Sequence, residues 1–68
     1  MYMEKFAQRL KELIGARSVS SVARETGINQ QTLSRYLLCQ REIGLEKLCK
    51  IANYFGEDLD FLTGRKGD

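Results

Sequence analysis

The sequence predicts an all-α fold, a single domain of five short helices. Apolar residues recur at intervals of three and four in several segments, which is the period of a buried helical face. No run alternates apolar and polar residues for long enough to predict a strand. With 68 residues, the chain is near the size at which one hydrophobic core is only just sufficient for stability.

The first helix and the last two are predicted from this spacing. The first covers residues 2–14 and ends at Gly15. Its apolar positions are Met3, Phe6, Leu10, Leu13 and Ile14. The fourth covers residues 45–55 and stops at Gly56. Its expected core residues are Leu45, Leu48, Cys49, Ala52 and Phe55. Asp58 can cap a short fifth helix. That helix would contain Leu59, Phe61 and Leu62.

The middle of the chain predicts two short helices that meet at a sharp turn. The hydroxyl of Ser18 can cap the first of the pair, and Gly27 supplies the left-handed backbone that ends it. Ile28 would fill the corner, and Asn29 is a good cap for the next helix. Ala23 is small enough to let the two helices cross closely. The residues expected to face inward are Val22, Ala23, Thr26, Leu33, Tyr36 and Leu37.

The outer face of the third helix would carry Gln30, Gln31, Ser34 and Arg35. Glutamine and arginine are the side chains best shaped to bind the edges of adenine and guanine in the major groove of DNA. A plainer interpretation is a helical hairpin that packs for stability alone and exposes polar residues by default. A solvated face is usually richer in Glu and Lys, however, and residues 27–41 contain no acid.

These two helices resemble the helix-turn-helix of the phage repressor and Cro family, and the resemblance extends from Phe6 to Gly64. The segment from Leu45 to Gly64 resembles the fourth and fifth helices of that family. The resemblance implies a compact five-helix lambda repressor-like DNA-binding domain over residues 1–64, with residues 65–68 as a tail or the start of a linker. It also implies a sequence-specific transcriptional regulator that inserts the third helix into the major groove of a palindromic operator.

The resemblance also implies a role for individual residues. Gln30 and Gln31 match a Gln-Gln pair at the start of the recognition helix in some lambdoid repressors and would read bases directly. Arg35 would reach a guanine or a phosphate, and Ser34 would assist in base reading. The residues expected to hold the DNA backbone are Ser18, Ser20, Asn29, Thr32, Gln40 and Arg41.

Three positions depart from the family pattern. Val19 stands where many relatives have a phosphate-binding Gln, so that contact would come from a neighbouring serine or be lost. Cys39 stands near a usual Gly, and Ile43 replaces a usual Pro. Leu38, Cys39 and Ile43 make an unusually apolar connection, which either packs under the fourth helix or contributes to a subunit contact. The candidate dimer contacts are Leu38, Ile43 and Phe61.

Charge is distributed unevenly along the chain. Eleven Lys and Arg against nine Asp and Glu give a net charge of +2, which alone says little about nucleic acid. Residues 5–41 hold seven basic residues but only two acids, whereas Glu57, Asp58 and Asp60 lie near the end. This pattern favours a basic part that faces phosphates, with an ordinary mixed surface as the alternative.

Composition argues against an enzyme. The chain has no histidine, and its two cysteines lie ten residues apart, so neither a zinc site nor the usual general base is indicated. We expect Cys49 in the core and Cys39 as an ordinary loop thiol. We expect no catalytic residue, metal, cofactor or small-molecule substrate. The first ten residues contain no long apolar run, which predicts neither a signal peptide nor a membrane helix.

Two functions from different classes remain open. The first is a DNA-binding regulator in the bacterial cytoplasm or nucleoid, a weak homodimer that pairs cooperatively on double-stranded operator DNA. The second is a helical protein-interaction module on the same scaffold, of antitoxin or coactivator type, which the apolar residues around Leu38 would favour. The sequence does not indicate the operator or the sign of regulation.

Overall fold

The computed structural model describes residues 2–65, and the helices in this range follow the predicted order. They are α1 (Tyr2–Ile14), α2 (Val19–Thr26), α3 (Gln30–Leu37), α4 (Leu45–Phe55) and α5 (Leu59–Thr63). No strand occurs in this range, which confirms the all-α prediction. Apart from Arg65, the predicted tail lies outside the described residues.

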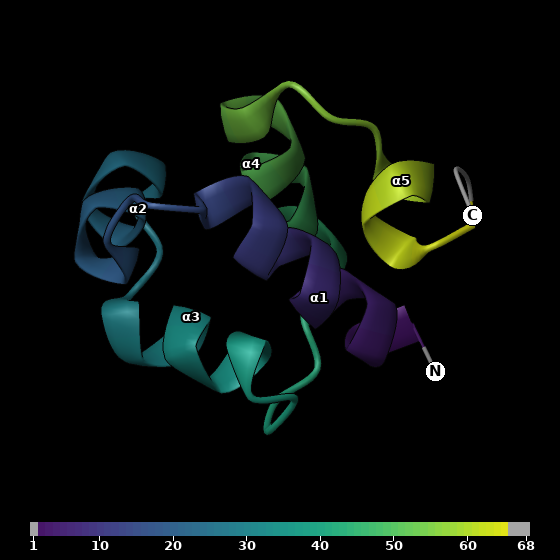
Figure 1. The fold of residues 1–68 in the computed structure, drawn as a ribbon, viewed down its shortest axis with the longest axis horizontal. Coiled ribbons are helices and arrows are strands. Elements are labelled where there is room, and N and C mark those ends of the chain that lie inside the picture. Colours follow the sequence, from purple (N-terminus) through teal and green to yellow (C-terminus); the bar gives the residue numbers. More distant parts are fainter. Residues whose placement is uncertain (1, 66–68) are drawn as a thin grey trace.

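The helices are arranged around α1 (Figure 1). α1 packs against α3 along one side and against α5 along the other. The α2–α3 pair lies at one end of the molecule and α5 lies at the opposite end, with α4 behind α1 in this view. The pair is therefore free to approach a partner without displacing α5.

The core draws on every helix. Its largest fully buried side chains are Phe6, Leu10, Val22, Leu33, Ile51 and Leu62. The rings of Phe6 and Tyr36 meet edge to face with centroids 6.2 Å apart, which joins α1 to α3. Burial of each large apolar side chain contributes roughly 1.5–3 kcal/mol, so a domain of this size depends on all of them.

The predicted caps around the sharp turn are confirmed. The Ser18 Oγ accepts a hydrogen bond from the Ser21 backbone N–H at 3.1 Å. Gly27 has the expected left-handed conformation, with φ of 77°, and its N–H donates to the Ala23 carbonyl. The Asn29 Oδ1 accepts from the Gln31 N–H at 2.8 Å. The Gly27 turn and the Asn29 cap thus set the direction in which α3 begins.

The prediction for the buried face of α4 was partly wrong. Leu45 is 68% exposed, and Ile51, which the prediction omitted, is fully buried. Cys49 and Phe55 are only half-buried. The buried stripe consists of Leu48, Ile51 and Ala52, at intervals of three and one, while the first residue of the helix lies beyond the core.

The structure corrects one of the candidate dimer contacts, Ile43 in the connection between α3 and α4. Ile43 is 4% exposed and belongs to the core, so in this fold it packs within its own chain and has little surface to offer a second subunit. Leu38 is 63% exposed and remains available. Cys39 has a left-handed backbone with φ of 57°, in the place where the family often has Gly.

Candidate nucleic-acid interface

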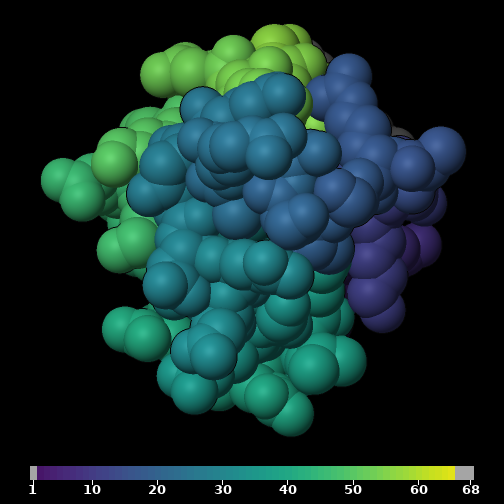
Figure 2. Space-filling model, turned by 90° about the vertical axis from the view of Figure 1, so that its left-hand side faces the viewer, coloured from purple at the N-terminus to yellow at the C-terminus, as the bar shows by residue number. Residues whose placement is uncertain are grey.

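The outer face of α3 brings the four predicted base-reading residues together. Gln30, Gln31 and Arg35 are exposed and Ser34 is half-buried. All four line one open hollow, which is completed by Asn29, Leu38 and Gln40. Figure 2 views the molecule from the end formed by α2 and α3, and shows α3 across the lower part of this face.

Helical geometry explains why these residues share a face. Positions 30, 31, 34 and 35 are separated by one, three and one residues, so they fall on one side of a helix. Leu33 and Tyr36 lie on the other side and are buried. The core contacts of these two residues therefore set the rotation of α3 and turn the polar side outward.

The side chains on this face are available for a ligand. Within residues 2–65, the side chains of Gln30, Gln31 and Arg35 make no hydrogen bond or ion pair with the rest of the protein. The amide groups keep both donors and acceptors, and the guanidinium keeps all its donors. Binding a base edge would therefore cost no internal hydrogen bond.

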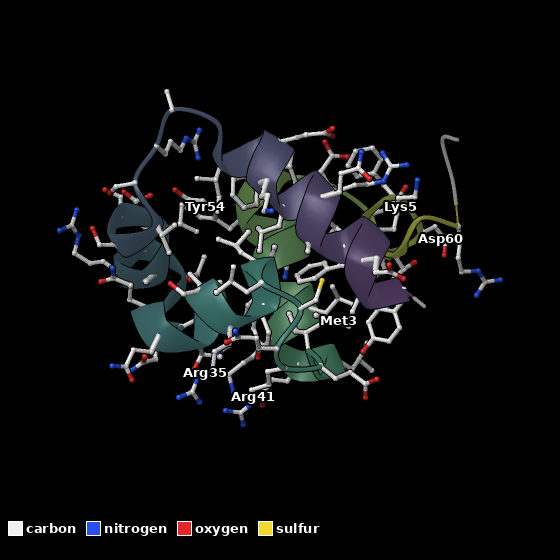
Figure 3. The ribbon with its side chains drawn as sticks, turned by 60° about the horizontal axis from the view of Figure 1, so that its bottom comes forward. Met3, Lys5, Arg35, Arg41, Tyr54 and Asp60 are labelled. Atoms are coloured by element: carbon white, nitrogen blue, oxygen red, sulfur yellow. The ribbon has the colours of Figure 1, made fainter. Side chains whose placement is uncertain are left out.

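A second basic side chain lies beside this face. Arg35 comes from α3 and Arg41 from the α3–α4 connection, and Figure 3 shows both pointing away from the body of the molecule on the same side. Burial raises the pKa of the Tyr36 hydroxyl, and the nearby Arg41 charge partly offsets this effect. Residues 27–41 contain no acid, so Arg35 has no acidic neighbour in α3, whereas Arg41 is followed directly by Glu42.

The start of α2 carries a cluster of hydroxyl groups. The Ser18 Oγ lies 3.2 Å from the Ser20 Oγ and 3.1 Å from the Ser21 Oγ. Val19, which replaces the family's usual Gln, is half-buried against the core. A phosphate contact at this helix start would therefore rely on the exposed Ser18 and Ser20 together with backbone N–H groups.

Other predicted site residues lie elsewhere or are less accessible. Thr32 is half-buried in α3, whereas Asn29, Gln40 and Arg41 are exposed. Phe61 lies on α5, across α1 from α3 (Figure 1). It is half-buried, with the Arg9 guanidinium 4.2 Å from its ring centre. The structure thus does not bring it together with the residues of the α3 face.

The basic first half of the sequence is not a uniformly basic surface. Arg9 is one of the seven basic residues in the range 5–41, but it is only 8% exposed and stacks on Phe61. The stacking joins α1 to α5 at the end away from α3. The charge pattern along the chain overstated the extent of the basic face because it carried no information on burial.

Sequence reasoning missed a cluster that fixes α2. The Tyr54 hydroxyl, from α4, donates a hydrogen bond to the Glu25 carboxylate of α2. Arg17 donates to the same hydroxyl at 3.3 Å and lies over the Phe55 ring at 5.7 Å. The hydrogen bond to Glu25 raises the pKa of Tyr54. Tyr54 lies 29 residues from Glu25 and 37 residues from Arg17 in the sequence, so no local pattern indicates these contacts.

Comparison with known families agrees with the geometry. The sequence matches the helix-turn-helix family over residues 10–62, more than half of the chain. The chain therefore belongs to the helix-turn-helix family, in its lambda repressor-like branch. It is a DNA-binding regulator of this family, and its fold is the five-helix domain that the resemblance implied. Comparisons with curated proteins and with solved structures gave no significant match.

Among residues 2–65, no three His, Cys, Asp or Glu side chains are grouped so that they could hold a metal ion. In the same range, none of the helices has the length and apolar character needed to span a membrane.

Proposed function

We propose that this protein is a sequence-specific regulator of transcription of the phage repressor or Cro kind, which inserts α3 into the major groove of an operator. The observation that carries the proposal is the outer face of α3. The side chains of its exposed Gln30, Gln31 and Arg35 make no hydrogen bond or ion pair within residues 2–65, and the Asn29 cap fixes the helix that holds them. The major groove is about 12 Å wide and admits one helix.

The roles of the residues follow from their chemistry. Gln30 and Gln31 would each present a donor and an acceptor to a base edge, the pairing that suits adenine. Arg35, one turn further on, would reach a guanine or a phosphate. Ser34, half-buried between them, would assist through its hydroxyl.

The DNA backbone would be held on both sides of α3. Ser18 and Ser20 would contact one strand from the start of α2, and Gln40 and Arg41 would contact phosphates from the α3–α4 connection. Asn29 and Thr32 would contribute at the first turn of α3. Such contacts position the helix but carry no direct sequence information.

The experiment is selection of binding sites from a pool of random double-stranded oligonucleotides, followed by titration of the selected site and a scrambled site at two salt concentrations. We expect a selected half-site of a few base pairs and an affinity for both sites that falls steeply with salt. Selection of no common sequence would contradict base reading. Absence of salt-dependent binding to either site would contradict DNA binding altogether.

A second candidate is a protein-interaction module on the same scaffold. The exposed Leu38 and Leu45 favour it, since they flank the α3–α4 connection at 63% and 68% exposure. Docking of an apolar protein surface need not weaken with salt, whereas phosphate binding must. The same titration therefore distinguishes the two functions.

A further inference from the structure

The connection between α3 and α4 is joined to the first turn of α1 by three contacts. The Tyr2 hydroxyl donates to the Ile43 carbonyl at 2.8 Å. The Ile43 N–H lies 3.4 Å from the Met3 Sδ, and the Cys39 Sγ lies 3.6 Å from the Met3 carbonyl oxygen. In Figure 3, Met3 points from α1 toward this connection. Tyr2 and Met3 are called the loop anchor below.

The loop anchor holds mainly the second half of the connection, because the first half already has backbone hydrogen bonds to α3. The first half is bonded back to α3, because the Cys39 N–H donates to the Tyr36 carbonyl and the Gln40 N–H donates to the Arg35 carbonyl. In the second half, the Gly44 carbonyl accepts from the Leu48 N–H of α4, and the two hydrogen bonds of Ile43 go to the loop anchor on α1. Arg41 lies between these two supports and is exposed.

The backbone of the connection is not one that the chain would adopt without support. Cys39 has a φ of 57°, in the left-handed region that side chains other than glycine rarely adopt. Such a residue persists when the surrounding structure holds it in place. The contact of its thiol with the Met3 carbonyl and the burial of Ile43 supply part of that support.

The Tyr2 hydroxyl is in its donor form at neutral pH, since even the ordinary pKa of tyrosine is 10.0. Desolvation raises the pKa of Tyr2, and the nearby Glu42 carboxylate raises it further. The phenol can therefore donate to Ile43 throughout the range in which DNA binding would be measured.

We propose that Tyr2 and Met3 are positioning residues that hold Arg41 where it meets the DNA backbone, so that the first turn of α1 sets the affinity for DNA without touching it. This inference rests on the proposed DNA-binding function. It extends that function to a helix that lies outside the helix-turn-helix pair and that no sequence pattern linked to the site.

The test compares Tyr2→Phe with Thr63→Val. Each removes one hydroxyl that donates to a backbone carbonyl, but Thr63 bonds to Leu59 within α5, away from the α3 face. We expect Tyr2→Phe to weaken binding about three- to tenfold for selected and scrambled sites alike, and Thr63→Val to leave both affinities unchanged. Amide hydrogen exchange at Ile43 should become faster in Tyr2→Phe only.

A double variant separates positioning from general stability. If Tyr2 acts through Arg41, Tyr2→Phe should add almost nothing to the loss already caused by Arg41→Ala. The slope of log affinity against log salt should flatten by the same amount in both single variants. Met3→Leu, which keeps the volume but removes the sulfur acceptor, should lower affinity in the same uniform way.

Each contrary outcome has a distinct meaning. Additive losses, or a Tyr2→Phe variant that binds as the unmodified protein does while Arg41→Ala binds more weakly, would overturn the loop anchor and leave the proposed function intact. If the unmodified protein bound neither site in a salt-dependent manner, the proposed function would fail, and the loop anchor's role in binding would fail with it.

Discussion

At the scale of single residues, Arg35 offers the clearest test of base reading. Its exposed guanidinium lies on the α3 face and makes no hydrogen bond within residues 2–65. We expect Arg35→Ala to cost roughly 1–3 kcal/mol of binding to the selected site and to relax the preference at one base pair of each half-site. Competition binding against single-base variants of the site measures both effects.

The matched control for Arg35 is Lys50→Ala, which removes one exposed positive charge from α4. A similar loss in both variants would mean that Arg35 acts through general charge alone. A preference profile that stays the same in Arg35→Ala would remove this residue from the reading face.

Arg41 should behave differently, because it projects from the connection rather than from α3. We expect Arg41→Ala to weaken binding to all sequences alike and to flatten the salt slope by about one unit, as for one lost phosphate contact. Titrations of the selected and scrambled sites at several salt concentrations test this. Loss confined to one base position would instead make Arg41 a base reader.

At the scale of helices and turns, Gly27 decides the angle between α2 and α3. A Cβ built at this position meets no heavy atom within 4 Å, so a substitution would strain only the backbone, whose φ is +77°. We expect Gly27→Ala to cost about 1 kcal/mol, or about 4–8 °C in Tm, and Gly27→Val to cost more. Gly44→Ser is the control, since Gly44 is equally open, has a φ of −83°, and caps the start of α4, where serine is well tolerated. Equal melting temperatures would contradict this account of the turn.

The Tyr54 cluster should make the position of α2 sensitive to alkaline pH. The hydrogen bond to Glu25 raises the pKa of Tyr54 above its ordinary value of 10.0, so folding favours the protonated hydroxyl. This contribution to stability is complete below the unfolded pKa and is lost as pH rises through the folded pKa. Thermal melting between about pH 8 and 11 should show a decline that is shallower in Tyr54→Phe than in the unmodified protein. Identical pH dependence in the two proteins would show that the hydroxyl contributes nothing.

The helix bounds could be predicted from sequence because their signals are local. Ser18, Asn29 and Asp58 act on backbone N–H groups two or three residues away, and Gly27 and Gly56 act on the residues just before them. The α3 face followed from helical period in the same way. These interactions need no knowledge of the tertiary fold.

Burial and distant contacts could not be predicted because they depend on how the helices meet. Leu45 continues the apolar period of α4 but lies past the end of the core, while Ile51 faces it. Arg9 is charged, yet it is buried and its guanidinium stacks on the Phe61 ring. Tyr2 reaches Ile43 across 41 residues. No spacing rule within one helix carries this information.

At the scale of the whole molecule, size limits how strongly two copies can associate. The accessible surface is 4349 Å². A stable interface of standard size covers about 800 Å² per partner, which would be about a fifth of this surface. With Ile43 in the core, Leu38 is the candidate contact that remains exposed beside α3. A strong dimer in free solution is therefore not expected.

DNA can compensate for a small interface. Two chains on adjacent half-sites, about one helical turn apart, are held at a high effective concentration, so a weak contact becomes sufficient. We expect a monomer or weak dimer in sedimentation at micromolar concentration, and a full palindromic site that binds two chains more tightly than two isolated half-sites do. Leu38→Ser should reduce this cooperativity more than it reduces half-site affinity, because the change removes an apolar contact but none of the predicted base-reading or backbone-holding side chains. If the full site bound no more tightly than independent half-sites, the protein would be a monomeric reader, and the exposed Leu38 would require another partner.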